Sequence, residues 1–259
     1  TEITAYTPPD ISALPEADYL VITHADFESE AQNLAAYRTS QGLSTLVLDI
    51  NDLYNTFNYG IYHPIAIKNF LGYTFDNWGT PPSYAVLIGD GHWNLKGYTG
   101  TEYGSPDPIY MPPNLAFVDP WQGEVDSANL LATLVGDDII PDLAIGRIPV
   151  STAQELNDVI NKITTYETIG IEDWQNHIIH IADNTPDPDG AGDFPTELDS
   201  LSESYLPPPR YQVDKFYLDD YCNPGGDCSA VTTDFIDALN TTGALLVTYN
   251  GHASLTWWA

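Results

Sequence analysis

Short apolar runs alternate with helical patterns along most of the chain, and this alternation limits the folds that the chain can adopt. The first runs typical of buried strands lie at 18–24, 44–49 and 84–89. Residues 28–41 show helical spacing and end before Gly42, which suits a helix C-cap, and 63–70 form a shorter helical pattern. Strands separated by helices predict a parallel sheet with right-handed crossovers.

The second half of the chain repeats this scheme. Runs typical of strands lie at 177–182, 211–218 and 244–249, and helical patterns lie between them. Gly170 is a plausible boundary between the halves. We therefore predict an α/β protein with two parallel-sheet, three-layer subdomains, residues 1–168 and 169–259.

Two other segments carry clear local signals. Thr152 and Glu155 have the spacing of a capping box, which predicts a helix that continues to about Glu167. Residues 94–125 are rich in Gly, Pro, Tyr and Trp, which predicts a long surface excursion. Its aromatic residues either pack locally, the favoured interpretation, or form a carbohydrate-binding surface.

The charge of the chain restricts its partners. Seven Lys and Arg residues stand against 37 Asp and Glu residues, which gives a formal net charge of −30. A nucleic-acid ligand is disfavoured because Lys and Arg must neutralise its phosphates. An anionic membrane surface would repel the chain, and no apolar run approaches 18 residues, so we expect no membrane insertion.

The cysteines bear on the compartment. The sequence holds two, Cys222 and Cys228, in a loop with two glycines. Such a loop can close a short disulfide, which would fit an oxidising, extracellular location; the alternative is two unconnected thiols. A zinc site is disfavoured because the loop offers no histidine and no second cysteine pair.

Ligands of parallel α/β sheets gather beyond the carboxyl ends of strands, and three acidic or histidine positions lie there: Asp90 with His92, Asp183, and His252. Gly251 lets the backbone turn off the last predicted strand, so His252 would project from the sheet edge. A histidine so placed suits general acid–base chemistry near neutral pH. The alternative is a loop histidine that is hydrogen-bonded to the backbone.

The loop after the strand at 177–182 places carboxylates at intervals suited to a hard cation. They belong to Asp183, Asp187, Asp189 and Asp193, and the loop contains two glycines. Calcium takes six to eight oxygen ligands, so this loop is a candidate structural calcium site. The alternative is a solvated acidic turn, as expected in a chain of this charge.

Several segments, in order along the chain, resemble the gingipain family of cysteine peptidases. They are Gly136–Val150, Val-Leu-Ile-Gly-Asp-Gly at 86–91, Ile-Ala-Asp at 181–183, Gly-Asp-Phe at 192–194, and Tyr-Asn-Gly-His-Ala-Ser at 249–254. The resemblance spans roughly residues 15–259. It implies a two-part α/β catalytic region whose second part is caspase-like, and it supports structural calcium.

The resemblance also implies roles for individual residues. His252 would be the catalytic histidine, although Ala253 stands where the family usually has glycine. Asp193 is the first choice for the acid that orients His252, and Asp183 is the second. Backbone N–H groups near Gly251 would help to hold the oxyanion.

The family's nucleophilic cysteine follows the histidine by a few tens of residues, at the end of the next strand, and this sequence contains no cysteine there. Neither Cys222 nor Cys228 matches its motif. We therefore expect the truncated or processed catalytic region of a secreted endopeptidase that needs its cysteine from outside these residues. The alternative is a catalytically inactive, peptidase-like body that serves as a structural subunit of an extracellular oligomer or filament.

The caspase-like subdomain would then be incomplete at its C-terminus and would leave an open, apolar sheet edge. We expect a C-terminal remainder or a neighbouring copy of the chain to cover that edge. A completed site would act on a polypeptide substrate.

Overall fold

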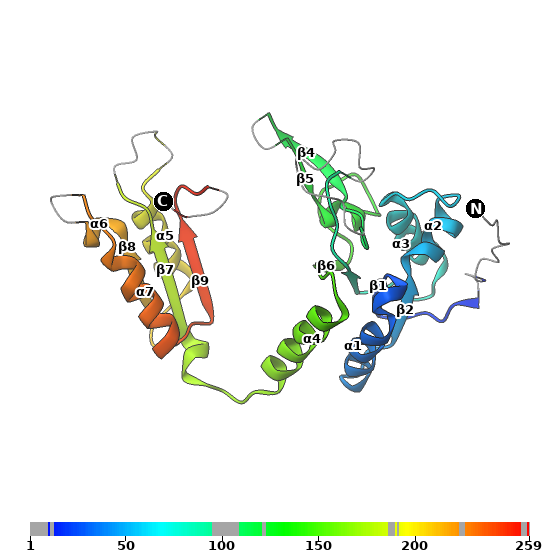
Figure 1. The fold of residues 1–259 in the computed structure, drawn as a ribbon, viewed down its shortest axis with the longest axis horizontal. Helices are drawn as coiled ribbons and strands as arrows, with labels where there is room; N and C mark the ends of the chain where they lie inside the picture. The colour runs from blue at the N-terminus through cyan, green and yellow to red at the C-terminus, as the bar shows by residue number, and fades with distance from the viewer. Residues whose placement is uncertain are drawn as a thin grey trace. The chain divides into compact units, whose positions relative to one another are not determined.

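The computed structural model describes residues 10, 13–94, 109–120, 123–185, 190, 192–222, 226–254 and 258. The chain divides into two compact units, Thr1–Thr168 and Ile169–Ala259. Each unit is an α/β body built on a parallel sheet (Figure 1). The mixed α/β fold with parallel strands is the one predicted.

The first unit contains a four-stranded parallel sheet with the order β2-β1-β3-β6. The strands are β1 (Tyr19–Thr23), β2 (Thr45–Asp49), β3 (Tyr84–Ile88) and β6 (Ala144–Ile148). Four of the five residues in each of the central strands β1 and β3 are buried. This burial is typical of a parallel sheet that is covered on both faces.

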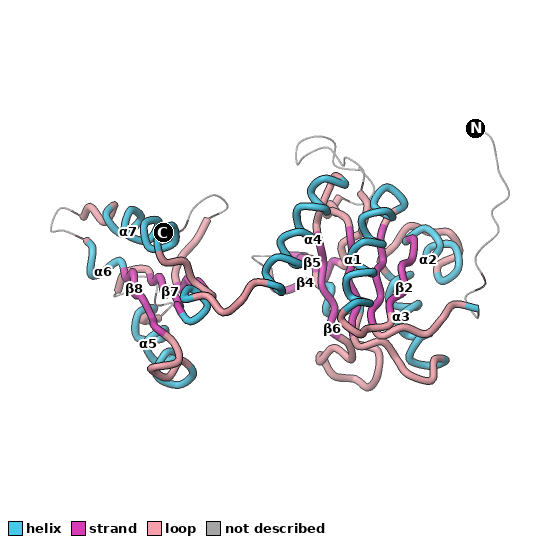
Figure 2. Tube along the Cα trace, turned by 90° about the horizontal axis from the view of Figure 1, so that it is seen from below, coloured by secondary structure: helices cyan, strands magenta, loops and turns pink. Residues whose placement is uncertain are grey.

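Helices cover both faces of this sheet, and two core clusters mark the two sides. They are α1 (Glu28–Ser40), α2 (Ile50–Phe57), α3 (Ile65–Asn77) and α4 (Ala153–Thr168). Leu53, Ile67 and Phe70 from α2 and α3 pack on one face. Leu34 and Leu156 from α1 and α4 pack on the other, so the unit has the three layers expected of the fold (Figure 2).

Two details of the first unit differ from the sequence-based prediction. Helix α2 was not predicted: it begins directly after β2, where the Asp49 side chain accepts a hydrogen bond from the Asn51 N–H at 2.8 Å. Helix α3 runs to Asn77 rather than Phe70, because its buried face continues through Leu71 and Thr74.

Other predictions of local structure are confirmed. The Glu155 N–H donates to Thr152 Oγ1 at 3.2 Å, and the Glu155 carboxylate accepts from the Thr152 N–H at 3.0 Å, which is the predicted capping box. Within the excursion at 94–125, the described residues include an antiparallel pair, β4 (Leu115–Asp119) and β5 (Gly123–Asp126). The short 3-10 helices are Ala25–Phe27, Ala128–Leu131 and Asp173–Asn176.

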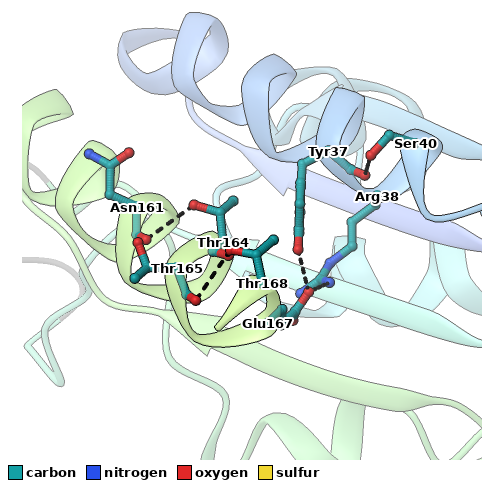
Figure 3. A network of polar contacts seen from close by, with 8 residues as sticks. All are labelled: Tyr37, Arg38, Ser40, Asn161, Thr164, Thr165, Glu167 and Thr168. Carbon is teal, nitrogen blue, oxygen red and sulfur yellow. Dashed lines mark hydrogen bonds and ion pairs between the residues drawn. The ribbon is translucent and has the colours of Figure 1, made fainter. Parts of the chain in front are cut away.

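A polar network joins the C-terminal ends of α1 and α4 (Figure 3). The Glu167 carboxylate accepts hydrogen bonds from Arg38 Nη1 at 2.7 Å and from the Tyr37 hydroxyl at 2.9 Å. The hydrogen bond from Arg38 is the main cause of the lowered pKa of Glu167. This network fixes the last turn of α4, where the first unit ends.

The second unit is built on three parallel strands with the order β8-β7-β9. The strands are β7 (His177–Ala182), β8 (Gln212–Tyr217) and β9 (Leu246–Asn250), and the helices are α5 (Phe194–Tyr205), α6 (Leu218–Tyr221) and α7 (Ala230–Thr241). Figure 2 shows α7 and α5 on opposite sides of β7 and β8. Phe194 of α5 and Val231 of α7 accordingly belong to two different core clusters.

Two features of the second unit, its disulfide and the edge of its sheet at β9, were predicted from the sequence. The disulfide between Cys222 and Cys228 is present, as predicted. Within the part of the chain that the structure describes, β9 pairs with β7 on one side and with no strand on its other side. Leu246 and Val247 of β9 are 49% and 36% exposed, and Leu245, directly before the strand, is 40% exposed. No described helix is long and apolar enough to cross a membrane.

Candidate active site

The ends of β7 and β9 bring two predicted site residues together. The strands are parallel neighbours, and Ala182 pairs with Asn250 at the last step of their register. The Asp183 N–H continues this ladder by donating to the Asn250 carbonyl at 3.0 Å. Asp183 and His252 therefore both emerge at the carboxyl edge of the sheet, where parallel α/β folds place their ligands.

The Asp183 carboxylate holds His252 at two points. Its Oδ2 lies 2.9 Å from His252 Nδ1 and accepts the His252 backbone N–H at 3.2 Å. The Asp183 side chain is 5% exposed, whereas that of His252 is 46% exposed. A buried carboxylate therefore supports an imidazole that solvent can reach.

The hydrogen bonds of Asp183 determine its ionisation. Burial alone raises the pKa of Asp183, but hydrogen bonds from the His252 ring and from the N–H groups of Asn184 and His252 lower it below its ordinary value. An ionised carboxylate can only accept hydrogen bonds, so Nδ1 of His252 carries a proton. In the neutral ring the lone pair then lies on Nε2, as a general base requires.

Gly251 makes the close approach of these residues feasible. A Cβ atom at position 251 would overlap the Asp183 Cβ and would lie 2.7 Å from the Tyr249 hydroxyl oxygen. The backbone between β9 and His252 therefore needs a residue without a side chain at position 251.

Helix α5 supports the site from one side. The Phe194 ring meets the His252 ring edge to face, with centroids 5.5 Å apart and an interplanar angle of 89°. Asn250 Nδ2 donates to Glu197 Oε2 at 2.8 Å, which ties the end of β9 to the first turn of α5. These contacts limit the rotation of the imidazole and of the strand end that carries it.

The structure pairs His252 with Asp183, the second choice for its orienting acid, and not with Asp193. Asp193 is the N-cap of α5: its two oxygens accept hydrogen bonds from the N–H and the hydroxyl of Thr196, at 3.1 and 2.8 Å. The sequence suggested Asp193 both as a metal ligand and as the orienting acid, but in the structure its carboxylate is engaged by the first turn of α5.

The predicted calcium loop is covered only in part. Asp187 and Asp189 lie outside the described residues. The described carboxylates fit a metal poorly, because Asp183 is committed to His252 and Asn184, and Asp193 caps α5. The described residues contain no group of three or more His, Cys, Asp or Glu side chains placed to hold a metal ion.

Sequence reasoning missed Phe194, Glu197, Asn250 and Tyr249 as parts of this site. The Tyr249 hydroxyl donates a hydrogen bond to the His252 carbonyl oxygen. Tyr249 and Asn250 lie in the motif that contains His252, and this closeness in sequence could have indicated that they contribute to the site. The contacts from α5 depend on helix packing, and no short-range pattern indicates them.

Comparison with known proteins assigns the family. Residues 12–259 match the family described as Peptidase family C25. The chain belongs to this family of cysteine peptidases, as the resemblance to gingipains suggested.

Individual relatives agree with this assignment. Gingipain R2 of Porphyromonas gingivalis is 24% identical over 262 residues, which cover 99% of this chain and 30% of the relative. The crystal structure of the Arg-specific cysteine proteinase gingipain R has a TM-score of 0.66 and 23% identity, over 98% of this chain and 50% of that one. A complex of the pro- and mature domains of RgpB from Porphyromonas gingivalis has a TM-score of 0.62 and 22% identity, over 93% and 49%. The structural likenesses show a shared fold, and the chain spans about a third of the curated relative.

We predict that the Asp183–His252 pair stabilises the fold in a pH-dependent manner. Because the folded-state pKa of Asp183 lies below its ordinary value of 3.8, the stabilisation is present above about pH 3.8 and is lost as the pH falls through the folded-state pKa. Asp183→Asn should lower the free energy of unfolding by about 1.5–3 kcal/mol at pH 7, and the difference from the unsubstituted chain should shrink in acid. Urea unfolding at pH 7 and at several pH values from 4 down to 2 measures this, and a difference that stays constant down to pH 2 would contradict the assignment.

We also predict that position 251 requires glycine. Gly251→Ala should lower the free energy of unfolding by about 1–3 kcal/mol, because the added methyl group overlaps Asp183 and the Tyr249 hydroxyl. Gly170→Ala is the matched control, since a Cβ atom there meets nothing within 4 Å. Equal effects of the two substitutions in urea unfolding would show that the close approach at Gly251 is not needed.

Proposed function

We propose that the second unit supplies the histidine and the orienting acid of a cysteine endopeptidase site. The observation that carries the proposal is the buried, ionised Asp183 on Nδ1 of the half-exposed His252, which leaves the Nε2 lone pair for proton transfer. Membership of peptidase family C25 makes a thiol the expected nucleophile. Both cysteines of this sequence are joined in a disulfide, so the nucleophile would come from outside these 259 residues.

The proposed reaction assigns each step to a named group. Nε2 of His252 takes the thiol proton while the sulfur attacks the carbonyl carbon of the scissile peptide bond. Asp183 stabilises the resulting imidazolium, and backbone N–H groups, with Gly251 proposed among them, hold the oxyanion. The C–N bond breaks as His252 returns the proton to the leaving amine. Water then hydrolyses the thioester with His252 as general base.

The activity of the complete protein tests this proposal. In a protein that contains the cysteine, His252→Ala should lower kcat/KM for a peptide substrate by at least about 10³-fold, and Asp183→Asn by on the order of 10³–10⁴-fold. His63→Asn is the control, because it removes an exposed imidazole in the first unit and keeps a side chain that can accept a hydrogen bond from the Ile65 N–H. Full activity of the His252 variant, or no labelling of the complete protein by a thiol-directed peptidase probe, would contradict the proposal.

A second candidate function, an assembly subunit, is favoured by the exposed apolar edge at β9. We propose that another polypeptide segment, from the remainder of the protein or from a second copy, pairs with this edge. If copies pair with one another, light scattering should show association of the chain, and Leu246→Lys should reduce it. Ile236→Lys is the control, because Ile236 on α7 is 47% exposed, close to the 49% of Leu246. A strictly monomeric chain at high concentration would eliminate self-assembly through β9.

Calcium remains a proposal that rests on Asp187 and Asp189. If the folded chain binds calcium there, removing the ion with EGTA should lower the melting temperature, because a ligand bound only to the folded state stabilises it. Asp187→Asn with Asp189→Asn should remove the EGTA effect, whereas Asp193→Asn should retain it, since Asp193 caps α5. An unchanged melting temperature in EGTA would exclude a stabilising calcium site.

An extracellular location is part of the same proposal. The Cys222–Cys228 disulfide supports it, because disulfides persist in oxidising compartments. The formal net charge of −30 is compatible with a highly soluble protein.

A further inference from the structure

Tyr249, three residues before His252, makes contacts that the proposed reaction does not use. Its hydroxyl donates a hydrogen bond to the His252 carbonyl oxygen. Its ring stacks on the Trp258 ring, with centroids 4.7 Å apart and an interplanar angle of 13°. An isolated antiparallel bridge joins Ala253 to Trp258. Trp258 is therefore packed against Tyr249.

Two side chains hold the His252 backbone by hydrogen bonds, and Tyr249 is one of them. The His252 N–H donates to Asp183 and the His252 carbonyl accepts from Tyr249, so both polar groups of its main chain are engaged. Gly251 lies between the Asp183 and Tyr249 side chains, since a Cβ atom at this position would contact both. The backbone on either side of the imidazole therefore has little freedom to rotate.

We propose that Tyr249 is a positioning residue for His252, and that its hydroxyl holds the peptide so that Nδ1 stays on Asp183. The inference rests on the proposed function for its catalytic meaning, although the positioning can be measured without catalysis. Without this hydrogen bond the His252 carbonyl could turn toward water, and the ring would spend more time away from Asp183. A general base that acts through Nε2 would then lose its fixed orientation.

The hydroxyl and the ring of Tyr249 have separable roles. The ring forms part of the wall of an apolar cavity of about 250 Å³, together with Ile181, Val231 and Phe235. Tyr249→Phe keeps the aromatic ring in this wall and its stacking on Trp258, and it removes the hydroxyl that donates to His252. Tyr221→Phe is the matched control in the same unit, because the Tyr221 side chain bonds to Asp234 and not to the His252 backbone.

The experiment measures how fast the His252 Nδ1 proton exchanges with water, by NMR of the chain at neutral pH. Loss of the hydrogen bond from the Tyr249 hydroxyl to the His252 carbonyl should accelerate this exchange about fivefold to tenfold in Tyr249→Phe. Tyr221→Phe should leave the rate unchanged. In a complete, active protein, Tyr249→Phe should also lower kcat and leave KM unchanged, which a merely structural role would not do.

The outcomes separate the inference from the proposed function. Unchanged proton exchange in Tyr249→Phe would overturn the positioning role and leave the Asp183–His252 pair intact. Absence of an Asp183-bound Nδ1 proton in the unsubstituted chain would overturn both. If the variant does not fold, the test is a nuclear Overhauser contact between the Tyr249 hydroxyl proton and the His252 α proton in the unsubstituted chain. The presence of this contact supports the positioning role of Tyr249, and its absence overturns that role.

Discussion

The parallel pairing of β7 with β9 is the constraint on which the candidate site depends. Their register ends with Ala182 opposite Asn250, and a backbone hydrogen bond from Asp183 to Asn250 extends it by one step. A slip of one residue would turn each side chain to the opposite face of the sheet and would separate Asp183 from His252. The buried residues along β7 oppose such a slip, so the hydrophobic core of the second unit fixes the geometry of its polar edge.

Electrostatics explains why one aspartate of this very acidic chain is distinctive. Most of the acidic residues in the described part of the chain are exposed, and water and salt screen their charges. Asp183 is buried, and its charge is tolerated because an imidazole and two backbone N–H groups surround it. The cost of burying the carboxylate is thus offset by groups that also fix the orientation of His252. Stability and chemistry depend on the same hydrogen bonds.

Sequence reasoning succeeded where the signal is local and failed where it is spatial. The strand and helix alternation, the Thr152–Glu155 capping box and the position of His252 at a strand end could all be read from short patterns. Asp193 was preferred as the orienting acid by motif position, yet Asp193 followed by Pro195 and Thr196 is also typical of a helix N-cap. The contacts of Phe194 and Tyr249 with His252 arise only when strands and helices pack.

The central claim is that Asp183 fixes His252 in the tautomer that a general base requires. The most direct test is nitrogen NMR of the His252 ring in the unsubstituted chain, at a pH where the ring is neutral. The account predicts a proton on Nδ1, in a hydrogen bond to a carboxylate, and an unprotonated Nε2. A proton on Nε2 with a bare Nδ1 would contradict the account, because Asp183 could then not be the partner that orients the ring.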